Sequence, residues 1–346
     1  MAYTTINKSS LHFNTKLYTG TGAEHAITGV GFQPDMVWTK RRDSTGDNHL
    51  HDAIRGATYK FQTNDSGADN TDAQTLKSFD SDGFTLGTNT SSNASSGTFV
   101  SWNWKGANGT ASNTDGSITS TVSANTTAGF SIVKWTATGS NATIGHGLGK
   151  APKWVWIKSR ANATWHMVYH AGPGNDRELG INSSNGASAT STAWQDTDPT
   201  SSVFYVSGSA GDGVSYSGEY MAYCFADITG FSKFGAYTGN NSTDGIFIYT
   251  GFKPAWIMVK RYGADGYNWT ILDNKRGNSF NGVDEWLYAN EGDATYDASS
   301  YHTDFLSNGI KIRHNGSYMN QSSDYLYCAF AEAPLVGSNN VPCTAR

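Results

Sequence analysis

One ten-residue pattern occurs three times in this chain, at residues 31–40, 149–158 and 251–260. Each copy has Gly three residues before Pro, a run of bulky or β-favouring residues, and Lys six residues after Pro. Proline fixes φ and lacks an amide donor, so it suits the start of a strand and not its centre. The run that follows is too short for a helix and predicts a largely buried strand, with the lysine where the strand returns to water. Three copies predict three related structural units.

Further elements recur in the same order around each copy. An aromatic residue in a short strand precedes each motif proline by 16 or 17 residues; these residues are Tyr18, Trp135 and Tyr237. An alternating run follows the motif, as expected for a strand with one wet face; the runs are 48–52, 166–170 and 269–273. Each unit closes on an apolar, aromatic strand that predicts burial on both faces; these strands are 98–105, 220–226 and 325–331.

The spacing of these elements predicts an all-β fold with little helix. We expect three related β-sandwich-like repeats of about 100 residues each, of lectin or jelly-roll type. The repeats alone leave open whether they form separate sandwiches or share sheets in one pseudo-threefold body. The expected division is a lead-in (1–10), repeat one (11–105), a Gly/Ser/Thr-rich linker with one strand near Ile118–Val122 (106–128), repeat two (129–229), repeat three (230–334) and a tail (335–346).

Composition narrows the class of protein. The 39 glycines and 15% charged residues suit strands joined by tight turns. A net charge of −5 argues against nucleic-acid binding, and no apolar run is long enough to predict membrane insertion. The first residues lack a signal-peptide pattern, so we expect folding in a cytoplasm. Cys224 and Cys328 lie in apolar runs and Cys343 lies near the tail, which favours buried thiols over disulfides.

The sequence contains no recognised catalytic motif and implies no cofactor. It has no C-x-x-C pair, H-E-x-x-H helix, phosphate loop or nucleophile elbow. Aspartates at 65, 69, 72, 80 and 82 are more consistent with solvated turns than with a Ca²⁺ site, so we predict no metal site and leave bound Ca²⁺ open. Asp52 and Asp273 each precede an arginine by three residues, which favours an ion-paired turn over a binding or catalytic pair.

Binding sites are expected in the polar loops of variable length, such as 64–75 and 182–200, because rigid β scaffolds commonly carry recognition on loops. Exposed aromatic rings can stack on sugars. Trp165 and Trp269, at the start of the alternating run in two repeats, are the weak candidates for such a ligand site. Most of the 11 Trp residues are expected in cores.

Several long motifs resemble a family of tailed-bacteriophage virion proteins, described as tail-fibre or lectin-like structural proteins of marine and cyanobacterial phages. The resemblance covers nearly the whole chain; its motifs are 1–8, 18–20, 31–34, 52–56, 78–87, 113–125 and 330–334. The resemblance transfers no catalytic residue. The closing strand Trp102-Asn103-Trp104 departs from the Trp-Cys or Trp-Trp pairs common in that family, a difference that concerns packing.

The resemblance implies a virion structural protein that is assembled in the host cytoplasm. The leading hypothesis is a tail-fibre or receptor-binding subunit that mediates host attachment, and not an enzyme. The alternatives are a capsid decoration or fibre-anchoring protein and, less favoured, a glycan depolymerase. The implied partners are other virion proteins of the tail, portal adaptor or capsid, host surface glycan, and further copies of the chain, as a homotrimer by analogy with phage fibres.

Overall fold

The computed structural model describes residues 3–188, 191–277, 282–337, 339 and 341. Its strand ladders are antiparallel, and the all-β prediction is confirmed. Within these residues the helices are one 3-10 turn, η1 (Ser9–Leu11), and one short turn, α1 (Thr90–Asn93), whose Asn89 cap accepts a hydrogen bond from the Ser91 amide. Neither helix has the length or apolar character needed to cross a bilayer.

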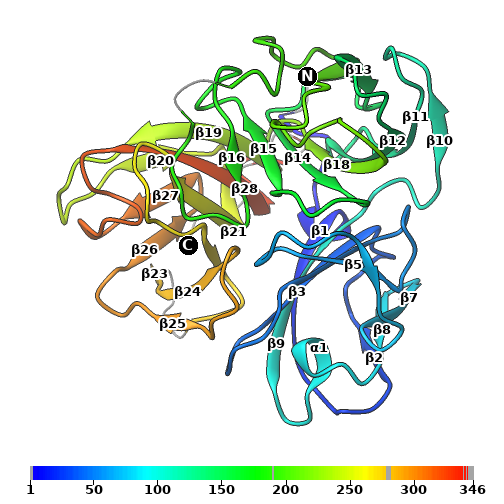
Figure 1. Ribbon diagram of the computed structural model, residues 1–346. Helices are drawn as coiled ribbons and strands as arrows, with labels where there is room; N and C mark the ends of the chain where they lie inside the picture. Colours follow the sequence, from blue (N-terminus) through cyan, green and yellow to red (C-terminus); the bar gives the residue numbers. More distant parts are fainter. Residues whose placement is uncertain (1–2, 189–190, 278–281, 338, 340, 342–346) are drawn as a thin grey trace.

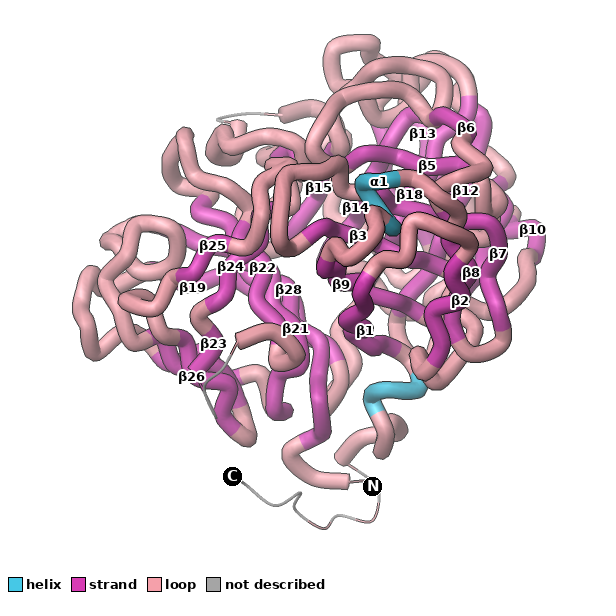
Figure 2. Tube along the Cα trace, turned by 90° about the horizontal axis from the view of Figure 1, so that it is seen from below, coloured by secondary structure: helices cyan, strands magenta, loops and turns pink. Residues whose placement is uncertain are grey.

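Each repeat has a large and a small sheet of its own, and the large sheets have the same strand order (Figures 1 and 2). In repeat one the large sheet is β1 (Phe13–Thr19), β9 (Thr98–Trp104), β3 (Met36–Arg41), β4 (His49–Asp52), β5 (Tyr59–Gln62) and β6 (Asn70–Thr71). Its small sheet is β2 (His25–Thr28), β8 (Gly83–Leu86) and β7 (Leu76–Asp80).

Repeats two and three follow the same plan, with the small sheet of repeat two reduced to two strands. The large sheet of repeat two is β10 (Ala111–Asn113), β11 (Ser120–Asn125), β12 (Phe130–Thr136), β18 (Glu219–Phe225), β14 (Trp154–Ser159), β15 (Met167–His170) and β16 (Leu179–Gly180), and its small sheet is β13 (Ala142–Gly145) and β17 (Val203–Val206). In repeat three they are β19 (Ser232–Thr238), β28 (Asp324–Pro334), β21 (Phe252–Arg261), β22 (Thr270–Asp273), β24 (Glu285–Tyr288) and β25 (Tyr296–Asp297), and β20 (Phe247–Tyr249), β27 (Gly309–Ile312), β26 (Thr303–Leu306) and β23 (Gly282–Val283).

The expected linker contributes two strands and not one. Both β10 and β11 extend the large sheet of repeat two, because β11 pairs with β12 from Thr121 to Asn125. The start of the segment is fixed to repeat one by the buried Asp35 carboxylate, which accepts hydrogen bonds from the amides of Gly106 at 2.8 Å and Asn108 at 3.2 Å. Residues 106–128 therefore join two repeats as part of the sheet structure.

The large sheets are covered on both faces. One face packs on the small sheet of the same repeat, and the other faces a core shared by all three repeats. Consequently β4, β15 and β22 are buried throughout, and the expectation of one wet face was wrong. The alternation of polar and apolar residues in these strands separates two buried environments. The closing strands are buried on both faces as predicted, apart from residues at their ends.

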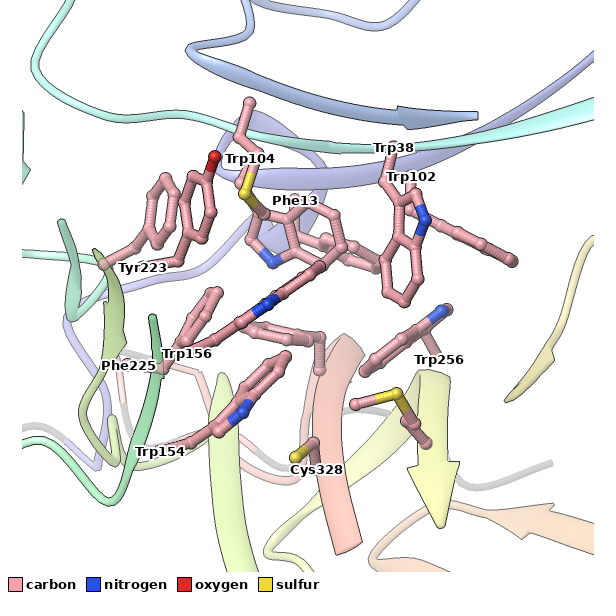
Figure 3. Packing of buried hydrophobic residues seen from close by; sticks show 14 of the residues in the cluster. Phe13, Trp38, Trp102, Trp104, Trp154, Trp156, Tyr223, Phe225, Trp256 and Cys328 are labelled. Atoms are coloured by element: carbon pink, nitrogen blue, oxygen red, sulfur yellow. The ribbon is translucent and has the colours of Figure 1, made fainter. Parts of the chain in front are cut away.

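The shared core is rich in aromatic residues that come from all three repeats (Figure 3). Equivalent residues of the three closing strands, Trp104, Phe225 and Phe330, contact one another with ring centroids 5.7–6.3 Å apart. The strands of the repeated motif add a second set of rings, and Trp38 of repeat one lies 5.4 Å from Trp156 of repeat two. The hydrophobic surface of each repeat is thus completed by the other two.

The buried thiols fit the same picture. Cys224 and Cys328 are free and buried on the closing strands, as expected, and burial raises the pKa of both. Cys343 lies outside the described residues.

The three motif lysines are buried, so the prediction that they return to water was wrong. Each ammonium group reaches one oxygen in its own repeat and one backbone carbonyl in a neighbour. Lys40 contacts Asn48 and Glu291, Lys158 contacts Thr164 and Ser66, and Lys260 contacts Tyr267 and Ser184, at 2.5–2.9 Å. The contacts run cyclically from repeat one to three, three to two and two to one.

Burial lowers the pKa of Lys40 and Lys260 to about 7 and that of Lys158 to about 8. Two oxygen acceptors per lysine match the two N–H groups of a neutral amine, so these hydrogen bonds survive loss of the proton. In the unfolded chain lysine titrates near pH 10.4. Between the folded and unfolded pKa values the unfolded state therefore binds more protons, and stability rises with pH.

We predict that the urea midpoint of unfolding rises between pH 7 and about pH 8.5. Above about pH 8.5 the cysteines of the unfolded chain ionise, which lowers the stability of the folded state and opposes the effect of the lysines. The Lys260→Met variant should show a smaller rise, because one of the three buried amines is gone. A wild-type midpoint that falls over this interval, or a slope unchanged in the variant, contradicts the burial of these lysines.

Candidate ligand-binding grooves between the repeats

The repeats meet through three equivalent backbone hydrogen bonds. The amides of Asp69, Ala187 and Thr295 donate to the carbonyls of Arg160, Tyr262 and Arg42 at 3.0, 2.9 and 2.8 Å. Each acceptor lies two residues after a motif lysine, and each donor lies in the loop that follows β5, β16 or β24. Two of these loops belong to the variable segments 64–75 and 182–200, where the sequence predicts binding. The fold thus places these loops against the neighbouring repeat.

An open groove of about 480 Å³ lies between repeats two and three. Its polar side chains are Arg177, Tyr262, Asp265 and Asp324, and its remaining lining is small: Pro173, Gly186, Ala187, Gly263 and Ala264. Asp265 accepts a hydrogen bond from the Gly186 amide at 2.7 Å, so one wall is fixed to the other. Burial and Asp324 raise the pKa of Tyr262, while Arg177 acts to lower it. The phenol is therefore a protonated donor at neutral pH.

A second groove of about 400 Å³ occupies the equivalent place between repeats one and three. Arg42 and Thr98 stand where Tyr262 and Asp324 stand in the first groove, and the other wall carries Asp284, Glu285, Thr295, Asp297 and Ser299. Arg42 reaches across to Glu285 at 3.4 Å. Both grooves therefore combine carboxylates with one guanidinium at a junction of two repeats.

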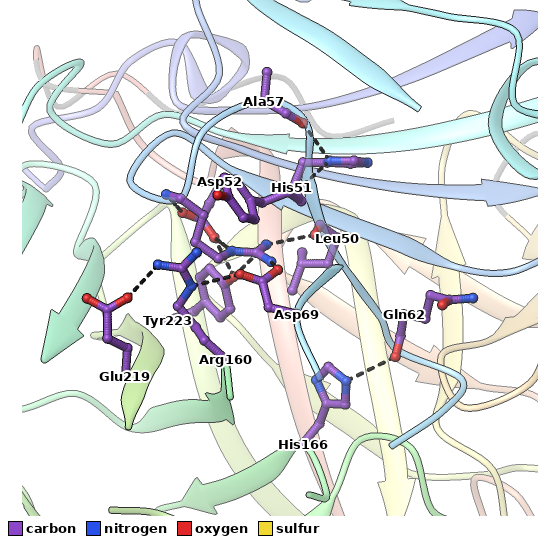
Figure 4. A network of polar contacts seen from close by, with 12 residues as sticks. Leu50, His51, Asp52, Ala57, Gln62, Asp69, Arg160, His166, Glu219 and Tyr223 are labelled. Atoms are coloured by element: carbon purple, nitrogen blue, oxygen red, sulfur yellow. Dashed lines mark hydrogen bonds and ion pairs between the residues drawn. The ribbon is translucent and has the colours of Figure 1, made fainter. Parts of the chain in front are cut away.

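At the third junction, between repeats one and two, side chains of both repeats form a network of ion pairs and hydrogen bonds (Figure 4). The Arg160 guanidinium pairs with Asp69 and Glu219, each at 2.7 Å, and lies 5.0 Å from the Tyr59 ring. Arg55 contacts the other oxygen of Asp69 at 2.8 Å. Asp69, 4% exposed at its side chain, is thus a bridge between two arginines and not the solvated turn residue that the sequence indicated.

The predicted ion-paired turns are confirmed and have a second role. Asp52 pairs with Arg55, and Asp273 pairs with Arg276, with all four side chains fully buried. Each aspartate also accepts a hydrogen bond from the neighbouring repeat, Asp52 from the Tyr223 hydroxyl at 2.7 Å and Asp273 from the Trp102 indole at 3.0 Å. At the matching position of repeat two, His170 contacts the Tyr327 carbonyl of repeat three at 3.2 Å.

The two tryptophans proposed for sugar stacking differ in exposure. Trp269 is fully buried, and its indole donates to the Gly180 carbonyl of repeat two at 2.8 Å, so it is not an exposed stacking surface. Its structural equivalent in repeat two is His166, which likewise contacts the Gln62 carbonyl of repeat one at 3.0 Å. Trp165 precedes that position by one residue and is 46% exposed. A one-residue offset in a strand moves the side chain to the other face.

The chemistry of the grooves is that of hydrogen bonding. Among the described residues no three His, Cys, Asp or Glu side chains are grouped to hold a metal ion. The carboxyl groups whose pKa burial raises are Asp35, Glu178, Asp227 and Glu291, and they do not line either groove. The groove residues come from two repeats each. In the sequence, one residue of each groove can be found from the repeated motif, because Tyr262 and Arg42 lie two positions after a motif lysine.

A family described as a domain of unknown function, DUF7483, matches residues 8–334. The chain belongs to this family. No curated protein and no solved structure is significantly similar to it. The match spans all three repeats and both grooves, so the family's unit is the three-repeat body and not a single repeat.

We predict that Asp52→Asn lowers the free energy of unfolding by about 3–5 kcal/mol, because it leaves Arg55 buried with one charged partner fewer. The matched control is Glu219→Gln. Its carboxylate is 42% exposed and also pairs with an arginine, so its loss should cost less than about 1 kcal/mol. Urea unfolding measures both. Equal effects of the two variants contradict a structural role for the buried pair.

Proposed function

We propose that this chain is a binding component of a tailed-phage particle, a tail-fibre or receptor-binding subunit, whose inter-repeat grooves take up glycan of the host surface. The observation that carries the proposal is the pair of equivalent open grooves, each lined by carboxylates and a guanidinium on a rigid β body. The sequence resemblance to phage virion proteins supplies the biological setting.

The groove between repeats two and three suits a sugar ring. The carboxylates of Asp265 and Asp324 accept hydrogen bonds from hydroxyl groups, and Arg177 donates them. The Tyr262 ring offers an apolar surface to the C–H face of a sugar. Gly186 and Gly263 allow the segments that line the groove to approach one another: a Cβ at Gly186 would lie 2.8 Å from the Tyr262 carbonyl oxygen, and one at Gly263 would lie 2.9 Å from Ser323 Oγ.

Binding is favoured over glycan cleavage by the position of the acidic groups. A glycosidase needs one carboxyl kept protonated beside a second carboxylate in the site. The described carboxyls with a raised pKa lie outside the grooves: Asp35, for instance, is held by the Gly106 and Asn108 amides. Two grooves per chain and several chains per particle would turn weak single contacts into stable attachment.

We predict that Tyr262→Ala weakens binding to an array of bacterial surface polysaccharides roughly ten-fold, equivalent to about 1.4 kcal/mol. Asp324→Asn, which keeps the volume of the side chain, should weaken it in the same direction. Trp165→Ala is the control, since it removes an exposed ring outside the groove. Loss of binding in the tryptophan variant with Tyr262→Ala unchanged, or no polysaccharide bound by the wild type, contradicts the proposal.

The position of the chain in the particle separates attachment from the alternatives. A near-atomic reconstruction of the intact particle is expected to show it in the tail fibre or tail tip. Its presence across the capsid lattice would instead indicate decoration. Reducing sugar released from host glycan by the purified protein, and abolished by one Asp or Glu substitution, would indicate a depolymerase.

A further inference from the structure

The outer edge of the small sheet is treated differently in the three repeats. The edge strands β2, β13 and β20 are equivalent, since they pair with β8, β17 and β27 through an isoleucine at the same place in the register, Ile27, Ile144 or Ile248. An uncovered strand edge presents free backbone groups to other chains, and proteins commonly cover or blunt it. Comparison of the three edges therefore shows where this chain leaves one open.

In repeat two the chain covers the edge itself. The Ile118 amide donates to the Thr143 carbonyl at 3.3 Å, and the Thr143 amide donates to the Ser117 hydroxyl at 2.9 Å. In repeat one the edge is small and polar, and just beyond it Asp82 accepts hydrogen bonds from the amides of Gly29 and Gly31 at 2.9 and 2.7 Å. The edge of repeat two is thus covered by residues of the same chain, whereas the edge of repeat one has the small side chains of Ala26 and Thr28 at the equivalent positions.

In repeat three the edge carries exposed aromatic residues. Phe247 is 44% exposed and Tyr249 is 50% exposed, where repeat two has Thr143 and Gly145. The Ile246 carbonyl accepts from Ile312 on β27, so by alternation the backbone groups of Phe247 and Tyr249 point away from the sheet. Within the described chain the Tyr249 carbonyl meets the Lys233 ammonium at 3.1 Å, and the backbone of Phe247 has no partner on this side.

The edge is also rigid and complementary to itself. The Tyr3 hydroxyl donates to the Gly251 carbonyl at 2.9 Å beside Tyr249, and Lys233 lies 5.3 Å from the Tyr249 ring. Lys233 therefore lies at the C-terminal end of β20. Asp244 lies at the N-terminal end, where it pairs with Lys311 of the same chain at 2.8 Å and stays 84% exposed at its side chain. An antiparallel pairing brings the N-terminal end of one strand to the C-terminal end of the other, so it sets Asp244 of one copy near Lys233 of the second.

We propose that β20 is the contact between two copies of this chain, which pair their β20 strands antiparallel about a twofold axis at Ile248. Phe247 of each copy would exchange backbone hydrogen bonds with Tyr249 of the other and place the two rings side by side. The contact is isologous and closes on itself as a dimer, whereas the analogy with phage fibres predicts a trimer. The small sheets of the two copies would form one continuous sheet.

Light scattering at tens of micromolar protein is expected to give twice the 37.2 kDa of one chain. Phe247→Lys should weaken the dimer at least ten-fold, because it places a charge on the pairing edge. Tyr216→Lys is the control, since Tyr216 is equally exposed, at 49%, in repeat two. A wild-type monomer or trimer, or a dimer that persists in Phe247→Lys, overturns the proposal.

A charge exchange tests the geometry without altering the strand. Asp244→Lys and Lys233→Asp each place like charges at both ends of the contact, so each protein alone should be monomeric. Mixed together, they restore opposite charges at both ends and should form a heterodimer. Failure of the mixture to associate, with both variants folded by circular dichroism, contradicts the antiparallel arrangement.

Discussion

The three-ring contact of Trp104, Phe225 and Phe330 is the interaction on which the rest of the structure depends. Each ring comes from the closing strand of a different repeat, so each large sheet buries its inner face only by packing against the other two repeats. Around the rings the repeats also make buried polar contacts in cyclic order. Each motif lysine contacts a backbone carbonyl of the neighbouring repeat. The side chains of Asn48, His166 and Trp269 do the same with the carbonyls of Ala289, Gln62 and Gly180, which lie at or just after the end of a strand. Buried donors without such partners would cost stability, so these contacts also fix how the repeats dock.

The same cyclic plan explains the grooves. At each junction the loop after β5, β16 or β24 of one repeat meets the end of the motif strand of a neighbouring repeat. Arg160 pairs with Asp69 and Glu219 at the junction of repeats one and two. Tyr262 and Arg42 hold the same position in the other two repeats and line the open grooves. Arg42 and Arg160 are the same residue type, so these two junctions differ in the residues that face the arginine: Asp69 and Glu219 at Arg160, but Thr295 and Thr98 at Arg42.

Much of the fold could be predicted from the sequence because it is encoded locally. The proline-led motif strands and the aromatic closing strands follow from backbone preferences and the pattern of apolar residues. The errors share one physical cause: burial between repeats is not encoded in the pattern of any single repeat. Lys40, His49 and Trp269 are all buried, although their sequence context indicated a wet or surface position. The grooves escaped prediction for the same reason, since residues such as Tyr262 and Arg177 belong to different repeats and meet only in the folded chain.

The central claim is that the three repeats form one body around a shared core. Differential scanning calorimetry tests it most directly, by comparing the calorimetric enthalpy of unfolding with the van't Hoff enthalpy. We expect a single transition in which the two enthalpies agree. Three separable transitions, or a purified segment 11–105 that unfolds cooperatively alone, would show that each repeat has a sufficient core of its own and would contradict this account.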